Sequence, residues 1–152
     1  YSIKFEIAAM VLLKNLSIND TAITIMDGEF ISLYPRDQNK YTLSSVKNTP
    51  IYKFENLFEI ENFYKYEINQ LNIKKIISNI IEDSNNYLNK NLKYSVEKKI
   101  WLSPKAKLVD DYNDTRVSEI KKYNKLFSIL CGKIDTVPII YDKLKQLIWQ
   151  KK

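Results

Sequence analysis

The hydrophobic pattern of this chain changes period near residue 53, and that change restricts the folds it can adopt. In residues 1–52 apolar and polar side chains alternate, as in half-buried β-strands. Between Ile73 and Ser84 the apolar residues recur at the three- and four-residue spacing of an amphipathic helix. Separate runs of strand and helix predict the α+β class, here an antiparallel β-sheet with helices packed on it and a C-terminal helix.

The strands of residues 1–55 are expected to form a β-meander. The first predicted strand has one apolar face, made by Ile3, Phe5, Ile7, Ala9, Val11 and Leu13. Three more strands are predicted at residues 21–26, 30–34 and 41–46, with turn signals at Asn19-Asp20 and Asp27-Gly28. The links between these strands are short and polar, whereas parallel neighbours need long crossovers, so the pairing is predicted to be antiparallel.

Residues 56–90 are predicted to be helical, with Asn56 as an N-cap. The first helix would use the apolar residues Leu57, Phe58, Phe63, Tyr64 and Leu71. The second would bury the stripe Ile73, Ile76, Ile77, Ile80, Ile81 and Ser84. Alternation predicts a strand over 94–103, a short extended segment at 115–117 and a strand over 126–130, and a last helix covers 137–149. Residues 1–152 are treated as a single domain.

The composition excludes several classes of site. There is no histidine, so a Ser-His-Asp system and histidine-ligated metals are ruled out. The single Cys131 cannot form an internal disulfide, which favours a cytoplasmic location. The acidic group Asp110, Asp111 and Asp114 lacks the glycine and glutamate of a calcium loop, so no metal site is predicted. The apolar run Ile7–Leu13 is far shorter than the ~20 residues of a membrane span.

The formal charge of +6 does not by itself indicate a nucleic-acid partner. Of 24 basic residues only Arg36 and Arg116 are arginine, and arginine is the residue favoured for bidentate phosphate recognition. We expect a solvated lysine face and no nucleic-acid binding.

Two positions could carry chemistry. Gly132 stands between a predicted strand and the last helix, where backbone N–H groups and Lys133 would face a ligand, and Thr136 could cap the helix or bond a ligand oxygen. An ordinary strand-to-helix turn explains the same residues. Arg116 could grip a carboxylate or a phosphate, or instead pair with a neighbouring aspartate such as Asp114.

Four segments resemble the D-amino-acid-oxidase-like superfamily of FAD-dependent oxidoreductases. Residues 128–136, Ser-Ile-Leu-Cys-Gly-Lys-Ile-Asp-Thr, resemble the Gly-Lys-(Ile/Leu)-x-Thr segment of its glycerol-3-phosphate-dehydrogenase-like members. Residues 114–117 are similar to the family's arginine-containing strand. Residues 22–35, with Met-Asp-Gly-Glu-Phe and a closing proline, resemble a hairpin of its substrate-binding sheet, and residues 41–50 resemble the next strand.

This resemblance implies a function. FAD would be the cofactor, and a small amino acid, amine or hydroxy acid would be oxidised. By the resemblance Arg116 would hold the acidic group of the substrate, and the flavin ring would be lined by Gly132, Lys133, Ile134 and Thr136. Tyr34 and Ser45 are further candidates, on the sheet face expected to cover the substrate.

The chain also departs from the family. Cys131, Asp135 and Val117 stand where the family often has Gly, Thr and Pro. The family binds the FAD pyrophosphate through Gly-x-Gly-x-x-Gly, which a chain with two glycines cannot contain. The resemblance therefore implies a substrate-binding portion whose FAD-binding domain would precede Tyr1. The alternative is a non-enzymatic basic α+β module that binds a protein or an anionic surface.

Overall fold

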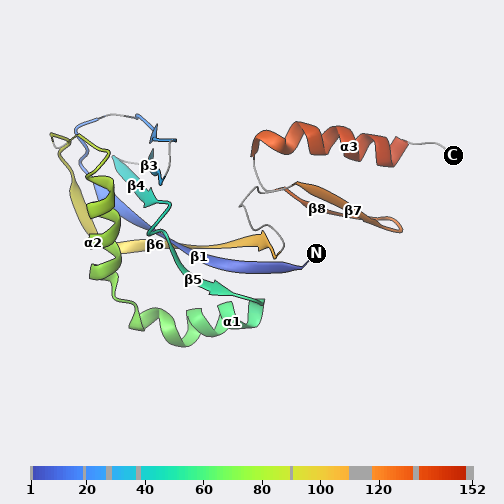
Figure 1. The fold of residues 1–152 in the computed structure, drawn as a ribbon, viewed down its shortest axis with the longest axis horizontal. Helices are drawn as coiled ribbons and strands as arrows, with labels where there is room; N and C mark the ends of the chain where they lie inside the picture. Colours follow the sequence, from blue (N-terminus) through green and yellow to red (C-terminus); the bar gives the residue numbers. More distant parts are fainter. Residues whose placement is uncertain are drawn as a thin grey trace. The chain divides into compact units, whose positions relative to one another are not determined.

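The computed structural model describes residues 2–18, 20–26, 29–36, 39–89, 91–109, 118–131 and 134–149. The chain divides into two compact units (Figure 1). The larger one, the sheet unit, comprises residues 5–106. The smaller one, the hairpin–helix unit, comprises residues 1–4 and 107–152.

The sheet unit is built around its first strand. Its strands are β1 (Ile3–Lys14), β2 (Ile23–Thr24), β3 (Ile31–Pro35), β4 (Lys40–Ser45), β5 (Pro50–Phe54) and β6 (Ser95–Leu108). The order is β2-β3-β4-β1-β5, and β6 pairs with β1 as well. The predicted antiparallel meander describes β2, β3 and β4, while β1 pairs with β4 rather than with β2.

Strand β1 is central because β4 and β5 pair with successive stretches of it. Val11 to Lys14 pair with β4, and Phe5 to Ala8 pair with β5. A register shift lies between Ile7 and Ala8, and the N–H of Ala9 donates to the carbonyl of Thr49 at 2.8 Å. Both faces of this stretch are covered, so Ala8 and Glu6 are buried along with the predicted inner residues Ile7, Ala9, Val11 and Leu13.

Helix α2 (Ile73–Ser84) packs on one sheet face, as predicted (Figure 1). Ile80 and Ser84 are buried, and Ile76, Ile77 and Ile81 are partly buried against the same cluster. Ile73, at the start of the stripe, is partly buried. The buried members of that cluster are Val11, Leu13, Leu16, Ile31, Leu33, Tyr41, Leu43 and Ile80. Three of these residues, Val11, Leu13 and Leu43, occupy one face of the paired strands, which fixes the face of the sheet that α2 covers.

A second cluster lies beside helix α1 (Leu57–Asn62) and the π-helix Phe63–Glu67 that continues it. Asn56 caps α1 as predicted: its side chain accepts a hydrogen bond from the N–H of Glu59 at 3.0 Å. The predicted inward residues Leu57 and Phe58 are exposed, and α1 buries Ile60 instead, followed by Phe63. The Phe63 ring packs against the rings of Tyr52, Phe54 and Tyr64.

Strand β6 is longer than expected. It passes Ser103-Pro104, where the sequence predicts its end, and continues to Leu108. Proline lacks an N–H donor but is tolerated where a strand has a free edge. Among the described residues β6 pairs only with β1, so it has such an edge. Contacts of Glu97 with Lys14 and of Lys93 with Ser17 show that β6 runs antiparallel to β1.

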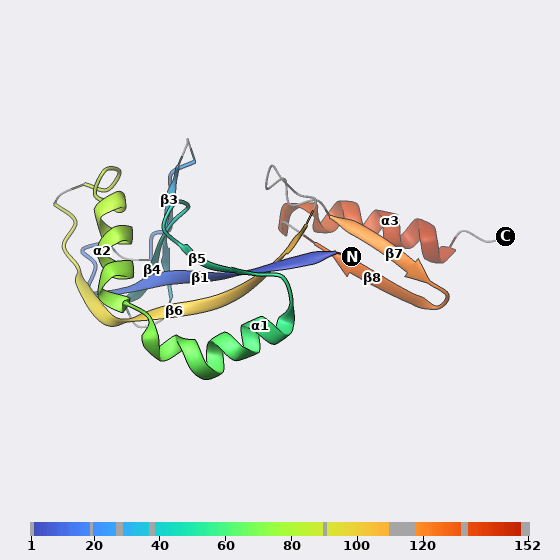
Figure 2. The ribbon, with the colours of Figure 1, turned by 60° about the horizontal axis from the view of Figure 1, so that its bottom comes forward.

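The hairpin–helix unit contains β7 (Glu119–Tyr123), β8 (Leu126–Leu130), a 3-10 helix (Ile134–Thr136) and α3 (Val137–Trp149). The two strands form an antiparallel hairpin whose turn residue Asn124 has φ of 53°, a left-handed conformation that asparagine tolerates. Figure 2 shows α3 lying along this hairpin. Strand β8 and helix α3 match the predicted ranges, whereas β7 and β5 were not predicted.

None of the helices in the described part of the chain combines the length and the apolar character needed to cross a membrane.

Candidate functional site

The start of helix α3 gathers three polar side chains. Ser118 precedes β7 and Cys131 follows β8, so the hairpin register Glu119↔Leu130 brings them opposite each other. Thr136, the last residue of the 3-10 helix, joins them. Its Oγ1 lies 2.5 Å from Ser118 Oγ and 3.5 Å from Cys131 Sγ, and Ser118 Oγ lies 3.9 Å from Cys131 Sγ.

Thr136 was selected from the sequence and Ser118 was not. The signal for Ser118 is the pairing of β7 with β8, which sets Ser118 beside Cys131 once residues 119–123 are recognised as a strand. The sequence predicts an extended segment at 115–117, a few residues before β7, so it does not pair Ser118 with Cys131.

Four other predicted site residues are Arg116, Gly132, Lys133 and Ile134. Arg116, Gly132 and Lys133 lie outside the described residues, as do Asp110, Asp111 and Asp114. Ile134 begins the 3-10 helix, but its side chain is also outside the description. The roles assigned to these residues remain predictions.

Tyr34 lies on β3 with 48% of its surface exposed. The Tyr34 hydroxyl is 2.7 Å from Thr24 Oγ1 on β2. On the other side of β3, Tyr34 is opposite Thr42 of β4. Both are hydroxyl-bearing side chains, so this face of the sheet is polar at Tyr34.

Ser45, at the end of β4, is fully buried and serves the fold. Its hydroxyl donates to the carboxylate of Asp83 on α2 and accepts from the N–H of Asn48 at 3.3 Å. Its own N–H donates to Thr49 Oγ1 at 2.9 Å. A serine hydroxyl has one proton, and Ser45 donates it to Asp83. This hydrogen bond links α2 to the sheet.

The sheet does not bring Tyr34 and Ser45 together. Ser45 pairs with Ile31, and Tyr34 lies three residues from Ile31 on the same strand. Since successive residues of a strand point to opposite faces, Tyr34 and Ser45 belong to opposite faces of the sheet. The expectation that both line one substrate-covering face is therefore not met: Ser45 lies under α2.

Within the described ranges, no three His, Cys, Asp or Glu side chains cluster in a way that could hold a metal ion.

The chain is similar to the FAD-dependent monooxygenase FPY4 of Fusarium mangiferae. The two are 28% identical over 128 residues, which is 84% of this chain and 34% of that protein. The chain thus spans about a third of the length of this curated relative. No family model matches the chain, and no solved structure matches it. The similarity relates the chain to FAD-dependent oxidoreductases in general.

Proposed function

We propose that this chain is the substrate-binding portion of an FAD-dependent oxidoreductase of the D-amino-acid-oxidase-like type. The observation that carries the proposal is the similarity to an FAD-dependent monooxygenase over 84% of the chain. The resemblance of residues 22–35, 114–117 and 128–136 to segments of that superfamily supports it.

The residues at the start of α3 suit one end of the cofactor. A helix N-terminus offers N–H donors and a positive partial charge, and Thr136 adds a hydroxyl beside it. Such donors fit the carbonyl groups and the reduced, anionic form of a flavin ring. The pyrophosphate does not fit this chain, because its binding turn needs three glycines and the chain has two. That part of FAD would be held by residues outside these 152.

When bound, the flavin would accept a hydride from the C–H bond beside an amine or hydroxyl of the substrate. The chain's own residues would bind and orient. Arg116 would hold the substrate's carboxylate or phosphate bidentately, and Gly132 would let the backbone approach the ring. Lys133 would add positive charge beside Ile134 and Thr136. Tyr34 would contribute a hydroxyl from the exposed sheet face, and Ser45 would act only by fixing α2 to β4.

The test uses the protein expressed from its whole natural reading frame. Amino acids, amines and hydroxy acids are mixed anaerobically with the flavoprotein, and bleaching of the flavin identifies a substrate. Replacing Arg116→Gln should then raise KM about ten- to a hundredfold, because a charged hydrogen-bond partner is lost. Lys53→Gln, which removes one exposed charge from β5, is the matched control. An unchanged KM in the Arg116 variant contradicts the assigned role.

A further inference from the structure

A row of cations crosses the sheet face opposite α2. The backbone N–H of Arg36 donates to the backbone carbonyl of Lys40 at 2.7 Å, so these two residues face each other across the β3–β4 hairpin. Lys40 is in turn the registered partner of Lys14 on β1. Directly opposed residues share a face, so Arg36, Lys40 and Lys14 lie side by side on three neighbouring strands.

This row is on the open side of the sheet. Lys14 follows the inward residue Leu13 in β1, and alternation places it on the other face. Lys14 is 43% exposed in its side chain and reaches Glu97 on β6 at 2.8 Å. Lys99 lies two residues beyond Glu97 and therefore on the same face. We name Arg36, Lys40, Lys14 and Lys99, with Glu97, the cationic row.

The like charges of the cationic row lower the stability of the folded protein. Like charges directly opposite each other on neighbouring strands destabilise a sheet, and here Lys14 and Lys40 are such a pair. Glu97 offsets only part of this charge. The hydrogen bond from Lys14 is the main cause that lowers the pKa of Glu97; burial opposes it, and the charges of Lys14, Lys40 and Lys99 add to it. Among the described residues, three lysines, Lys14, Lys40 and Lys99, thus act on the one carboxylate of Glu97.

The side chains of Arg36 and Trp101 meet on this face of the sheet. Strands β3 and β6 are separated by β4 and β1, which sets them ~14 Å apart in a flat sheet. The guanidinium carbon of Arg36 nevertheless lies 4.3 Å from the centre of the Trp101 ring on β6. Both side chains are long enough to lean toward each other across β4 and β1, so Arg36 reaches over the cationic row toward β6. Figure 2 shows β3 and β4 turned steeply away from the direction of β1 and β6.

We propose that the cationic row binds a small soluble ligand through a phosphate-type group, with Arg36, Lys40 and Lys14 as its contacts. A phosphate carries nearly two negative charges and three strong acceptor oxygens, which matches three neighbouring cationic donors better than a single carboxylate does. The three residues stand on neighbouring strands that span only ~10 Å, a width that suits one small molecule. Trp101, 46% exposed, borders the site.

This proposal is independent of the flavoenzyme proposal. It uses contacts within the sheet unit alone, and it involves neither Arg116 nor the turn before α3. It holds equally if the full protein binds no flavin.

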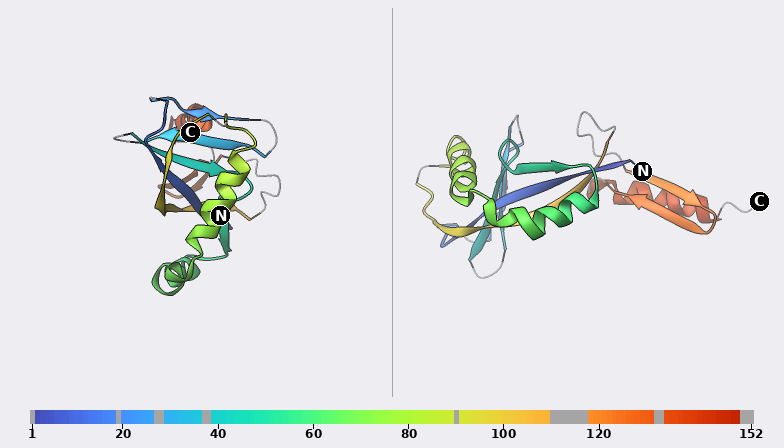
Figure 3. Two further views of the ribbon diagram at one scale, coloured as in Figure 1. Left: turned by 90° about the vertical axis from the view of Figure 1, so that its left-hand side faces the viewer. Right: turned by 90° about the horizontal axis from the view of Figure 1, so that it is seen from below.

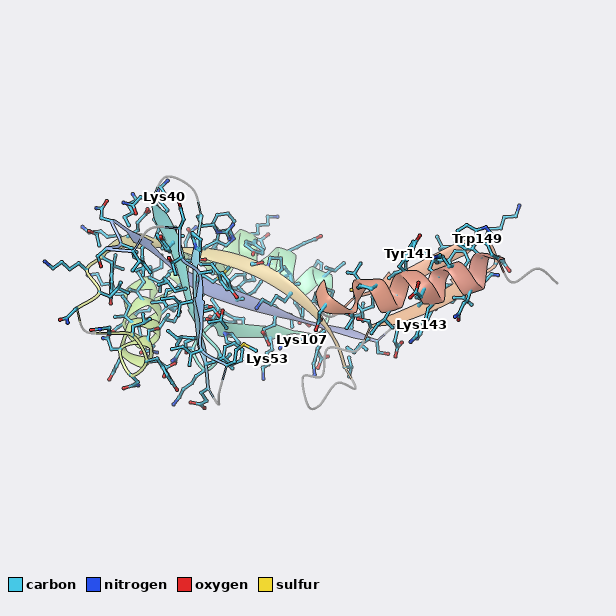
Figure 4. All side chains as sticks on the ribbon, turned by 90° about the horizontal axis from the view of Figure 1, so that it is seen from above. Lys40, Lys53, Lys107, Tyr141, Lys143 and Trp149 are labelled. Carbon is cyan, nitrogen blue, oxygen red and sulfur yellow. The ribbon has the colours of Figure 1, made fainter. Side chains whose placement is uncertain are left out.

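The experiment follows the fluorescence of Trp101 during a titration with inorganic pyrophosphate. The chain has two tryptophans, so the 152-residue chain carrying Trp149→Phe leaves Trp101 as the reporter. Lys40→Gln is the test variant. Lys53→Gln is the control. Lys53 pairs with Glu6 of β1, whereas Lys40 pairs with Lys14, and these two β1 residues are eight residues or ~26 Å apart. Both lysines are labelled in Figure 4.

The proposal predicts a saturable change in Trp101 emission and a dissociation constant about tenfold weaker in Lys40→Gln, but unchanged in Lys53→Gln. It also predicts that Lys40→Gln raises the melting temperature of the ligand-free chain, because a repulsive pair is removed, and reduces the stabilisation by pyrophosphate. The absence of saturation overturns it, and so does equal weakening in both variants. Equally tight binding of succinate overturns the phosphate assignment. Lys40-dependent sedimentation with phosphatidic-acid vesicles overturns the small-ligand assignment.

Discussion

The two units of the chain differ in how they bury apolar surface. Among the described residues, the buried apolar side chains belong to the sheet unit, with the single exception of Ile140 on α3. The hairpin–helix unit leaves large apolar side chains exposed on its strands and its helix, including Leu126 at 66% and Trp149 at 67%. In Figure 4 Tyr141 and Trp149 lie along one side of α3 and Lys143 along the other.

This difference shows that the sheet unit has its own core, whereas the hairpin–helix unit depends on one helix packed on two strands. A two-stranded hairpin by itself is marginal in water, so the stability of this unit depends on the packing of α3 against the hairpin. The right-hand view of Figure 3 shows the helices of each unit beside the strands of the same unit. We therefore expect the amides of the two units to exchange with solvent at different rates, with the slowest in β1 and α2.

The largest effect is expected from breaking the sheet unit at Phe63. Its side chain is fully buried and touches three other rings, so Phe63→Ala should lower the free energy of unfolding by ~3–5 kcal/mol. Phe58→Ala, which truncates a ring that is 69% exposed, is the control and should cost well under 1 kcal/mol. Urea unfolding measures both. Equal losses would contradict the placement of the core.

Ile140→Ala tests the hairpin–helix unit in the same way. Removing its one buried apolar side chain among the described residues should cost ~2 kcal/mol locally. Hydrogen exchange should speed up for the amides of α3 and stay unchanged for those of α2. Ile139→Ala, at a 56% exposed position, should change neither. Faster exchange throughout both units would show that they unfold together.

Ser45→Ala tests whether α2 is fastened to the sheet by a hydrogen bond. The variant leaves the half-buried Asp83 carboxylate without its donor, so a loss of ~1–3 kcal/mol is expected in urea unfolding. Ser44→Ala is the matched control, because the hydroxyl of Ser44 makes only a 3.5 Å contact. A loss no larger than that of Ser44→Ala would remove the structural role of Ser45.

Asn56→Ala should have a smaller effect, ~1 kcal/mol, because it removes the cap of α1. Glu59 would also lose its contact with the Asn56 side-chain amide, 2.9 Å away. Thermal unfolding followed by circular dichroism measures the change. Asn62→Ala, which lies within the helical segment and makes no cap hydrogen bond, should shift the midpoint less.

The smallest effect concerns pH. Because Lys14 lowers the pKa of Glu97, the folded state favours the charged carboxylate. This stabilisation is present above the pKa of Glu97 in the unfolded chain and is lost as the pH falls through the lower pKa of the folded state. Lys14→Gln should raise the pKa of Glu97 toward its ordinary value, as measured by NMR titration of the carboxyl carbon. The same pKa in both proteins would contradict the ion pair.

The sequence predicts the sheet unit well wherever the spacing of apolar residues matches the residues that are buried. The stripe of α2, the inner face of β1 and the Asn56 cap follow from spacing alone. The central position of β1 does not, because pairing with β4, β5 and β6 depends on contacts far apart in the chain. Leu57 and Phe58 fit a helix, yet α1 buries Ile60 instead. Which face of α1 is buried is set by the packing of the rings around Phe63.

The candidate site was less predictable. Strand alternation could have separated Tyr34 from Ser45, but only with the β3–β4 register, in which Ile31 faces Ser45. The cationic row could not be predicted from the sequence for the same reason. Only the strand register shows that Arg36, Lys40 and Lys14 lie side by side.

The most direct test of the proposed function is the FAD content of the protein purified from its whole natural reading frame. The account predicts a yellow protein with a flavin absorption spectrum, and acid release should yield FAD in about equal amount to the protein. A colourless protein that neither contains FAD nor takes it up on dialysis would contradict the account.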